Sequence, residues 1–350
     1  MALQHTKMQA KELLTQSYDF TLPPELIASH PVSPRDHARL LVYDRASDTI
    51  THTHFYEFEK FIPPNAALIF NDTKVIKARI FGKKESGGRV ELLINRPLSA
   101  FDISVYIRGK VTVGTRLSFG ADLVAVVVKL LEDGSRNVHF YHHETQLRFE
   151  SLLPILDAIG HVPLPPYIQR EDDATDSSEY QSVFAKQEGA VAAPTASLHF
   201  TQEQHERICK NFNHAYVTLH ISSGTFKPVD SEIITEHPMH AEYYEISQSA
   251  KEILDDRAIP ILSIGTTSTR TVEFYDKHGK QQSGEANLFL HPHNPPSRVN
   301  HLLTNFHLPK STLIMLVASF VGLEKTLQLY NEAIQKRYRF FSYGDAMLIL

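Results

Sequence analysis

The chain has 350 residues, of which 42% are hydrophobic and 21% are charged, and its formal net charge is −5. This composition is typical of a globular protein with an apolar core, and the length favours two domains. The single cysteine, Cys209, excludes an internal disulfide framework and favours a reducing compartment. The longest apolar run, residues 313–321, is far shorter than the ~20 residues that span a bilayer, so we expect a cytoplasmic protein.

The expected elements begin with short apolar strands at residues 38–44 and 66–72. Residues 75–143 then alternate short apolar runs with turn-length gaps, show no helical period, and contain a hairpin signal at Gly87-Gly88. This pattern predicts a small barrel or sandwich.

Strand and helix patterns alternate again after residue 143. Residues 145–159, 201–212, 247–258, 313–320 and 324–338 favour helices, with Thr201 as a cap, and residues 214–222 and 259–267 favour strands. Residues 160–187 are rich in proline and acids and are expected to form an ordered functional loop. The order of elements predicts an α/β domain with a mixed sheet, residues 1–73 plus 146–350, that carries an inserted small β-barrel, residues 74–145.

Charge is segregated along the chain. Residues 74–116 hold ten basic and three acidic side chains, whereas residues 121–180 hold eleven acidic and four basic ones. A basic block of this kind can present a phosphate-binding face on a protein whose net charge is negative. Lysines that protect exposed sheet edges give the same pattern, so composition alone leaves both interpretations open.

Polar side chains stand directly before the last apolar helix: Asn305, His307, Lys310 and Ser311. Pro309 suits a first helical turn, and Ser311 or Thr312 can cap it. The first N–H groups of such a helix favour an anionic ligand. The alternative is a well-capped helix with a solvated lysine.

Hydroxyl-rich stretches recur at residues 189–201, 219–229 and 263–274. Strands that end in such Gly/Ser/Thr loops can build one pocket along a sheet edge, although turn residues are common at strand ends in general.

Residues 236–246 contain an H-x-x-H-x-E pattern, but Pro238 separates its first histidine from the rest and no second cluster completes a metal site. Strand alternation would place His240 and Glu242 on one face, so acid–base chemistry is favoured there and no metal is expected.

Several collinear blocks carry a resemblance to a known family: NDTKVIKARIFG (71–82), GHVPLPPYIQRE (160–171), YQSVFA (180–185), GAVAAPTASLHFT (189–201), GTTSTRT (265–271), LLTNFHLPKSTLIMLVASF (302–320) and YRFFSYGDAML (338–348). On these blocks the chain resembles the S-adenosylmethionine:tRNA ribosyltransferase-isomerase family of queuosine biosynthesis over nearly its whole length. The resemblance implies an α/β domain with an inserted β-barrel. A nucleic-acid-binding module without chemistry and an S-adenosylmethionine-dependent RNA methyltransferase are the rival interpretations. The absence of a glycine-rich nucleotide fingerprint speaks against the second.

The reaction that the resemblance implies transfers the ribosyl part of S-adenosylmethionine to a 7-aminomethyl-7-deazaguanine base at the wobble position of tRNA. The ribose isomerises, epoxyqueuosine forms, and adenine and methionine leave. S-adenosylmethionine is then a consumed substrate, so no cofactor is expected, and the partners are this substrate and tRNA, without a membrane or an obligate protein partner.

Site residues follow from the same resemblance. The candidates for the base that removes a proton beside the sulfonium are His199, His220, His240, His307, Asp72 and Glu242. The candidates for binding S-adenosylmethionine are Thr195, Thr225, Lys227, Thr266, Thr267, Arg270, Asn305, Lys310 and Ser311, with Lys310 expected at the methionine carboxylate. The candidates for binding tRNA phosphates are Lys74, Lys77, Arg79, Lys83, Lys84 and Arg89.

Other positions are ambiguous or depart from the family pattern. The aromatic side chains of Tyr338, Phe340, Phe341 and Tyr343 either stack on an unpaired base or belong to the core. Ser222, Tyr243 and Asn287 replace a glycine, a tryptophan and an aspartate that are usual in the family. If the aspartate contacts substrate in the family, Asn287 must do so without charge.

Overall fold

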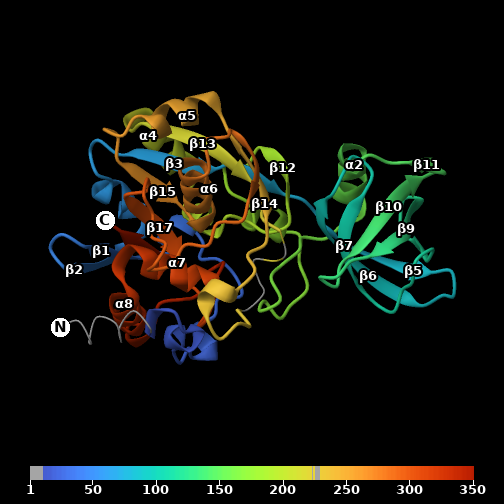
Figure 1. The fold of residues 1–350 in the computed structure, drawn as a ribbon, viewed down its shortest axis with the longest axis horizontal. Helices are drawn as coiled ribbons and strands as arrows, with labels where there is room; N and C mark the ends of the chain where they lie inside the picture. Colours follow the sequence, from blue (N-terminus) through green and yellow to red (C-terminus); the bar gives the residue numbers. More distant parts are fainter. Residues whose placement is uncertain (1–10, 223, 225–228) are drawn as a thin grey trace.

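Two β-sheets organise the chain in a computed structural model that describes residues 11–222, 224 and 229–350. The main sheet is mixed and has nine strands (Figure 1). Their order is β16 (Ser283–Ala286), β14 (Glu242–Ile246), β13 (His214–Leu219), β3 (Ala67–Asn71), β15 (Ile261–Ile264), β17 (His301–Asn305), β18 (Ala346–Ile349), β1 (Arg39–Asp44) and β2 (Thr49–His54).

The centre of this sheet consists of four parallel strands, β13, β3, β15 and β17. Strand β3 is buried along its whole length, which explains why its sequence is a continuous apolar run without alternation. Parallel strands end at the same edge of a sheet, and ligands of α/β proteins bind at that carboxyl edge. The segments that follow these four strands are therefore brought together.

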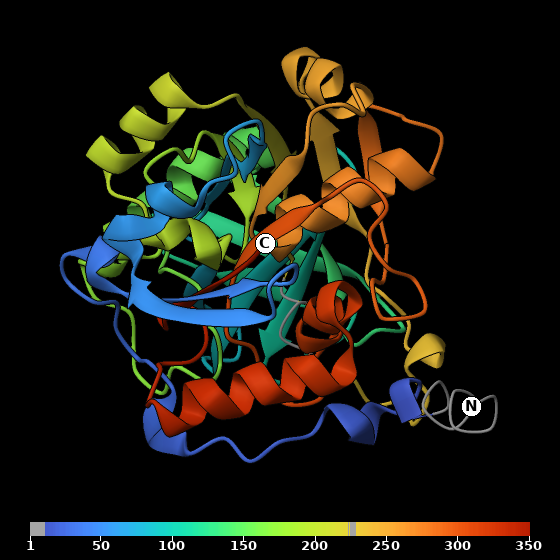
Figure 2. The same ribbon diagram turned by 90° about the vertical axis from the view of Figure 1, so that its left-hand side faces the viewer.

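Helices cover both faces of the main sheet. They are α4 (Gln202–Asn211), α5 (Gln248–Asp255), α6 (Thr266–Lys277), α7 (Thr312–Val321) and α8 (Leu323–Gln335). Leu41 of β1 belongs to the core formed with α5 to α8, whereas its neighbour Leu40 packs with Phe55 and with Ile208 of α4. Figure 2 shows α8 lying across the face of the sheet on which α5 to α8 pack. Among the described residues no single helix could span a membrane; α7 and α8 meet the length and composition only together, across a bend of 112°.

The second sheet closes into a six-strand barrel at the other end of the molecule (Figure 1). Its strands are β5 (Arg79–Lys84), β6 (Arg89–Pro97), β7 (Ile103–Arg108), β8 (Arg116–Ser118), β9 (Leu123–Leu130) and β10 (Arg136–His142), with β11 (Thr145–Gln146) as an appendage. Pairing of β9 with β10 completes the closure. Helix α2 (Phe149–Ile159) packs against the barrel core, which it extends through Leu152 and Leu156.

A short parallel pair, β4 (Thr73–Val75) with β12 (Gln187–Ala190), lies where the chain passes from the main sheet to the barrel. The segment between α2 and β12 contains only the short helix α3 (Asp176–Glu179). It is the predicted functional loop, and Figure 1 shows it between the two sheets.

The fold class predicted from the sequence is confirmed: a mixed α/β sheet and a separate small barrel. Thr201 caps α4 by accepting a hydrogen bond from the backbone N–H of Gln204, as expected. The limits predicted for the inserted domain, residues 74–145, stay a prediction.

Two local expectations are wrong. The hydroxyl-rich stretch after β15 is not a loop, because Gly265, at a φ of 91°, turns the chain directly into α6. His240 precedes β14, which begins at Glu242, so strand alternation does not relate these two side chains.

Candidate active site

A cavity of about 290 Å³, here called the strand-end cavity, opens at the carboxyl edge of the main sheet. Ile221 follows β13, Thr266 and Thr267 follow β15, and Asn305 and His307 end or follow β17. The stretches that follow β13 and β15 therefore meet Asn305 and His307 at one site, because these strands and β17 run parallel.

The first turns of two helices contribute to this cavity. Helix α6 starts at Thr266, and α7 starts at Thr312 behind its cap Ser311, whose hydroxyl accepts from the N–H of Ile314 at 3.3 Å. The first N–H groups of a helix have no intrahelical acceptor and carry partial positive charge. The cavity thus offers two places for an anionic or electron-rich group of a ligand.

Hydrogen bonds between side chains hold the polar wall of the cavity in place. The Thr195 hydroxyl donates to Asn305 Oδ1 at 3.0 Å, and Asn305 Nδ2 lies 3.2 Å from His199 Nε2. On another wall, Asn71 Nδ2 donates to the Thr267 hydroxyl at 3.2 Å. The positions of Thr195, Thr267 and Asn305 are therefore fixed before any ligand arrives.

His307 is the candidate base that the structure places on the cavity wall. Its Nε2 lies 2.9 Å from the Thr304 hydroxyl, and its backbone N–H donates to the Tyr330 hydroxyl at 3.1 Å. Burial lowers the pKa of His307 to about 3, since there is little water to solvate an imidazolium. The ring is therefore neutral at physiological pH.

Other expected bases lie outside the strand-end cavity. His199 is buried behind Asn305, and burial likewise lowers its pKa to about 3. His220 Nδ1 lies 2.8 Å from the Thr73 hydroxyl, and burial lowers its pKa. Asp72 accepts from the Thr218 hydroxyl at 2.7 Å, and burial raises its pKa.

His240, Glu242 and Arg270 line a second, smaller cavity of about 30 Å³, here called the Arg270 cavity. Leu313 of α7 lines both cavities, so the two adjoin. Among the described residues, no group of three or more His, Cys, Asp or Glu side chains is placed to hold a metal ion.

The expected S-adenosylmethionine-binding residues divide into groups. Those that line the strand-end cavity are Thr195, Thr266, Thr267, Asn305 and Ser311. Lys310 is not in its lining, and its Nζ pairs with Asp19 at 3.2 Å. Thr225 and Lys227 lie outside the described residues.

Sequence reasoning missed the tyrosines that the long loop contributes. Tyr167 and Tyr180 both line the strand-end cavity, and the Tyr167 ring lies 4.1 Å from that of Phe341. A signal was present, because both tyrosines fall within the collinear blocks that carried the resemblance. Only their apolar surroundings, which come from other segments, reveal that they line a cavity.

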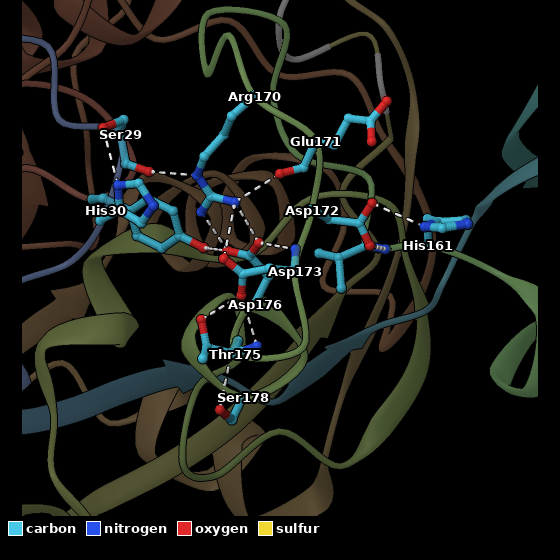
Figure 3. Close-up of polar contacts among 12 residues, drawn as sticks. Ser29, His30, His161, Arg170, Glu171, Asp172, Asp173, Thr175, Asp176 and Ser178 are labelled. Carbon is cyan, nitrogen blue, oxygen red and sulfur yellow. Dashed lines mark hydrogen bonds and ion pairs between the residues drawn. The ribbon is translucent and has the colours of Figure 1, made fainter.

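A buried ion pair fixes this loop (Figure 3). Asp176 is fully buried, and it accepts from Arg170 Nη1 and Nη2 at 2.6 and 2.7 Å and from the backbone N–H of Asp173 at 2.9 Å. Asp172 accepts from the backbone N–H of Val162 at 3.0 Å, which ties the same loop to its own beginning. Tyr167 and Tyr180 are thus carried by a segment with its own polar core.

Comparison with known proteins decides the family. Residues 15–349 match the family model described as queuosine biosynthesis protein. The chain is 69% identical to the S-adenosylmethionine:tRNA ribosyltransferase-isomerase of Sulfurimonas denitrificans, over 98% of this chain and 100% of that protein. It is 59% identical to the protein of the same name from Nitratiruptor sp., over 97% of this chain and 99% of that one.

The chain belongs to the queuosine biosynthesis protein family. A crystal structure of S-adenosylmethionine tRNA ribosyltransferase from Thermotoga maritima aligns with it at a TM-score of 0.53 and 32% identity, over 95% of this chain and 100% of that chain. The resemblance drawn from the sequence blocks is thereby confirmed, and with it the expectation that this protein is an enzyme of queuosine biosynthesis.

The basic residues that were expected to bind tRNA differ in whether they are already paired with acidic residues. Several are paired with acids: Lys74 with Glu188 at 2.8 Å, Lys77 with Asp157 at 3.1 Å, and Arg79 with Glu91 at 2.8 Å. Lys84 Nζ donates to the carbonyl of Lys110. Lys83 and Arg89 are exposed and face each other across β5 and β6.

The remaining positions can now be placed. Tyr338, Phe340 and Tyr343 are buried in the core, whereas Phe341 lines the strand-end cavity. Tyr243 is exposed, and its ring lies 6.0 Å from that of His220. Asn287 lies at a separate open cavity beside His237, and not at the strand-end cavity.

Proposed function

We propose that this protein transfers and isomerises the ribosyl moiety of S-adenosylmethionine onto the 7-aminomethyl-7-deazaguanine base at the wobble position of tRNA. Epoxyqueuosine-tRNA forms, and adenine and methionine are released. The observation that carries the proposal is the strand-end cavity, where two helix starts and a neutral histidine meet in a member of the queuosine family. Relatives named S-adenosylmethionine:tRNA ribosyltransferase-isomerase support the same reaction.

The strand-end cavity suits the nucleoside part of S-adenosylmethionine. Its volume of about 290 Å³ lies near the lower end of small-molecule sites, which usually measure roughly 300–1,000 Å³. Tyr167 and Phe341 present adjacent aromatic rings to it, and such rings favour a planar base. Hydroxyl and amide groups that line the same cavity, including those of Thr267 and Asn305, would orient the sugar and the base.

In this proposal His307 removes the proton from the carbon beside the sulfonium, whose positive charge stabilises the resulting ylide. Burial keeps the imidazole unprotonated, so its ring nitrogen can accept a proton, but the same burial lowers its basicity. Its conjugate acid would be strong for the same reason. The proton taken from carbon can therefore pass to a nitrogen of the departing adenine, which returns His307 to its neutral form.

The barrel is proposed to hold the anticodon arm. Lys83 and Arg89 are exposed neighbours on its surface, where they are available to phosphates. The paired cations Lys74 and Lys77 lie nearer the junction of the two sheets, and a phosphate would have to compete with Glu188 or Asp157 for them.

S-adenosylmethionine is consumed in the reaction, so no cofactor takes part. The proposal places the enzyme in the cytoplasm without an obligate protein partner.

The test combines purified protein, S-adenosylmethionine and an anticodon stem-loop that carries the aminomethyl-deazaguanine base. Mass spectrometry follows the RNA, and chromatography follows free adenine and methionine. We expect epoxyqueuosine RNA with equal amounts of adenine and methionine, and we expect His307→Gln to abolish all three products while S-adenosylmethionine still binds. Transfer of a labelled methyl group to the RNA, or unchanged RNA despite binding of both substrates, would overturn the proposal.

A further inference from the structure

The Arg270 cavity is small, polar and adjacent to the strand-end cavity. Its volume is about 30 Å³, whereas a water molecule needs ~10–15 Å³ on the same measure. It therefore has room for about two to three water-sized polar groups. Because Leu313 lines both cavities, a ligand held in the strand-end cavity can extend past this side chain into the Arg270 cavity.

Arg270 lines this cavity and has one donor nitrogen without a hydrogen-bond partner among the described residues. The residue is only 7% exposed; its Nη1 donates to Glu242 Oε2 at 2.7 Å and its Nε to the Leu288 carbonyl at 3.3 Å. Its Nη2 has no hydrogen-bond partner within the described part of the chain. A buried guanidinium nitrogen without an acceptor costs free energy, so the site favours a ligand that supplies one.

The start of α7 faces the same cavity. Thr312 and Leu313, the first residues of this ten-residue helix, line the Arg270 cavity together with Arg270. Ser311 caps the N–H of Ile314 and leaves the preceding N–H groups available. A carboxylate placed between Arg270 Nη2 and this helix start would accept charge-assisted hydrogen bonds from both.

Glu242 determines what kind of ligand fits. It is 2% exposed, and besides Arg270 it accepts from the backbone N–H of Ser222 at 2.9 Å. Its charge balances that of Arg270, so a simple anion entering the cavity would meet a carboxylate as well as a guanidinium. A group with both charges, a carboxylate and an adjacent ammonium, matches the Arg270–Glu242 pair better than phosphate does.

We propose that the Arg270 cavity receives the zwitterionic amino-acid end of S-adenosylmethionine, with its carboxylate at Arg270 Nη2 and the start of α7 and its ammonium at Glu242. This inference rests on the proposed function. It replaces the expectation that Lys310 binds the methionine carboxylate, since Lys310 pairs with Asp19 and does not line either cavity. It also gives Arg270 and Glu242 a joint role in recognising one substrate, in place of a role for Glu242 in proton transfer.

The test compares three ligands by calorimetry: S-adenosylmethionine, its decarboxylated analogue, and 5′-methylthioadenosine, which lacks the whole amino-acid end. We expect the wild-type protein to bind S-adenosylmethionine at least about tenfold more tightly than the decarboxylated analogue. Arg270→Lys keeps a positive charge for Glu242 but removes the second nitrogen. It should abolish this preference and leave the affinity for 5′-methylthioadenosine unchanged.

Arg298→Lys is the matched control. Arg298 is also buried, but its side chain donates to backbone carbonyls such as that of Leu254 and lines neither cavity. This variant should lose stability and keep the wild-type preference among the three ligands. Equal binding of S-adenosylmethionine and its decarboxylated analogue to the wild-type protein would overturn the inference, and so would an Arg270→Lys variant that loses affinity equally for all three.

The two proposals fail in different ways. A protein that makes epoxyqueuosine RNA but shows no preference for the carboxylate overturns the inference about Arg270 alone. A protein that binds none of the three ligands overturns the proposed function together with it.

Discussion

Arg170 and Asp176 form two parallel hydrogen bonds, 2.6 Å from Nη1 to Oδ2 and 2.7 Å from Nη2 to Oδ1, within the loop that lines the strand-end cavity. The Tyr343 hydroxyl adds a third side-chain hydrogen bond to the same carboxylate at 2.9 Å. Burial opposes ionisation of Asp176, but these hydrogen bonds outweigh it and hold the pKa of the carboxyl below its usual value. The hydrogen bond from Tyr343 thus joins the long loop to the C-terminal segment of the chain.

Asp176→Asn is expected to destabilise the protein by about 3 kcal/mol, because it leaves the Arg170 guanidinium without its buried counter-charge. Urea denaturation measures this loss as a lower midpoint at an unchanged slope. Glu171→Gln is the control, since the Glu171 side chain is exposed and only its carbonyl accepts from Arg170. A loss below about 1 kcal/mol for Asp176→Asn would mean that the ion pair does not hold the loop.

Tyr180→Phe is expected to leave the stability of the ligand-free protein unchanged or to raise it by up to about 1 kcal/mol. The Tyr180 hydroxyl is buried and makes no hydrogen bond of good geometry among the described residues, so removing it sacrifices little. Tyr343→Phe is the matched comparison and should cost about 1–3 kcal/mol, because it removes a donor to a buried carboxylate. Chemical denaturation of both variants checks the contrast. Equal losses would show that Tyr180 has a partner in solution.

Acid is expected to destabilise the fold through two buried histidines. Burial lowers the pKa of both His199 and His307 from 6.5 to about 3. Between these values the unfolded chain binds more protons than the folded one, so the free energy of unfolding falls as the pH drops below about 6.5. Each histidine should contribute about 1 kcal/mol of this loss between roughly pH 7 and pH 5.5.

Denaturation at the two pH values measures this effect. His307→Gln should remove the contribution of this histidine to the pH dependence of the free energy of unfolding, whatever its effect on overall stability. His54→Gln, at an exposed position of β2, should leave this pH dependence unchanged. An unaltered pH dependence in His307→Gln would contradict the assignment of a neutral buried imidazole.

Charge reversal on the barrel is expected to weaken RNA binding selectively. Lys83→Glu combined with Arg89→Glu removes two exposed cations, and the slope of the affinity against salt should fall by about one for each phosphate that is no longer neutralised. The affinity for S-adenosylmethionine should not change. Filter binding at several salt concentrations checks the slope.

Two further variants serve as comparisons for the charge reversal on the barrel. Lys74→Ala should have a smaller effect, because Lys74 is already paired with Glu188. Lys210→Glu, at an exposed position on α4, should have none. A loss of RNA affinity in Lys210→Glu as large as that on the barrel would indicate a general charge effect and not an interface.

The sequence by itself determined the elements whose signals are local. The cap at Thr201, the hairpin at Gly87 and the run of barrel strands each depend on neighbouring residues, so each is readable without tertiary contacts. The order of the sequence blocks along the chain was sufficient to identify the family. It also indicated that hydroxyl-rich stretches gather at a sheet edge, because parallel strands impose that outcome.

Only the tertiary structure decided which polar residues share a cavity. His199 and His307 look alike in sequence, yet one lies behind Asn305 and the other on the wall, since side-chain access depends on segments far apart in the chain. The sequence suggested that Lys310 binds a carboxylate, but in the fold its Nζ pairs with Asp19, nearly three hundred residues away. Arg270, by contrast, has a side-chain nitrogen that finds no hydrogen-bond partner in the described part of the chain. Local pattern determines what a residue can do, and burial and pairing across the fold determine whether it is available to do it.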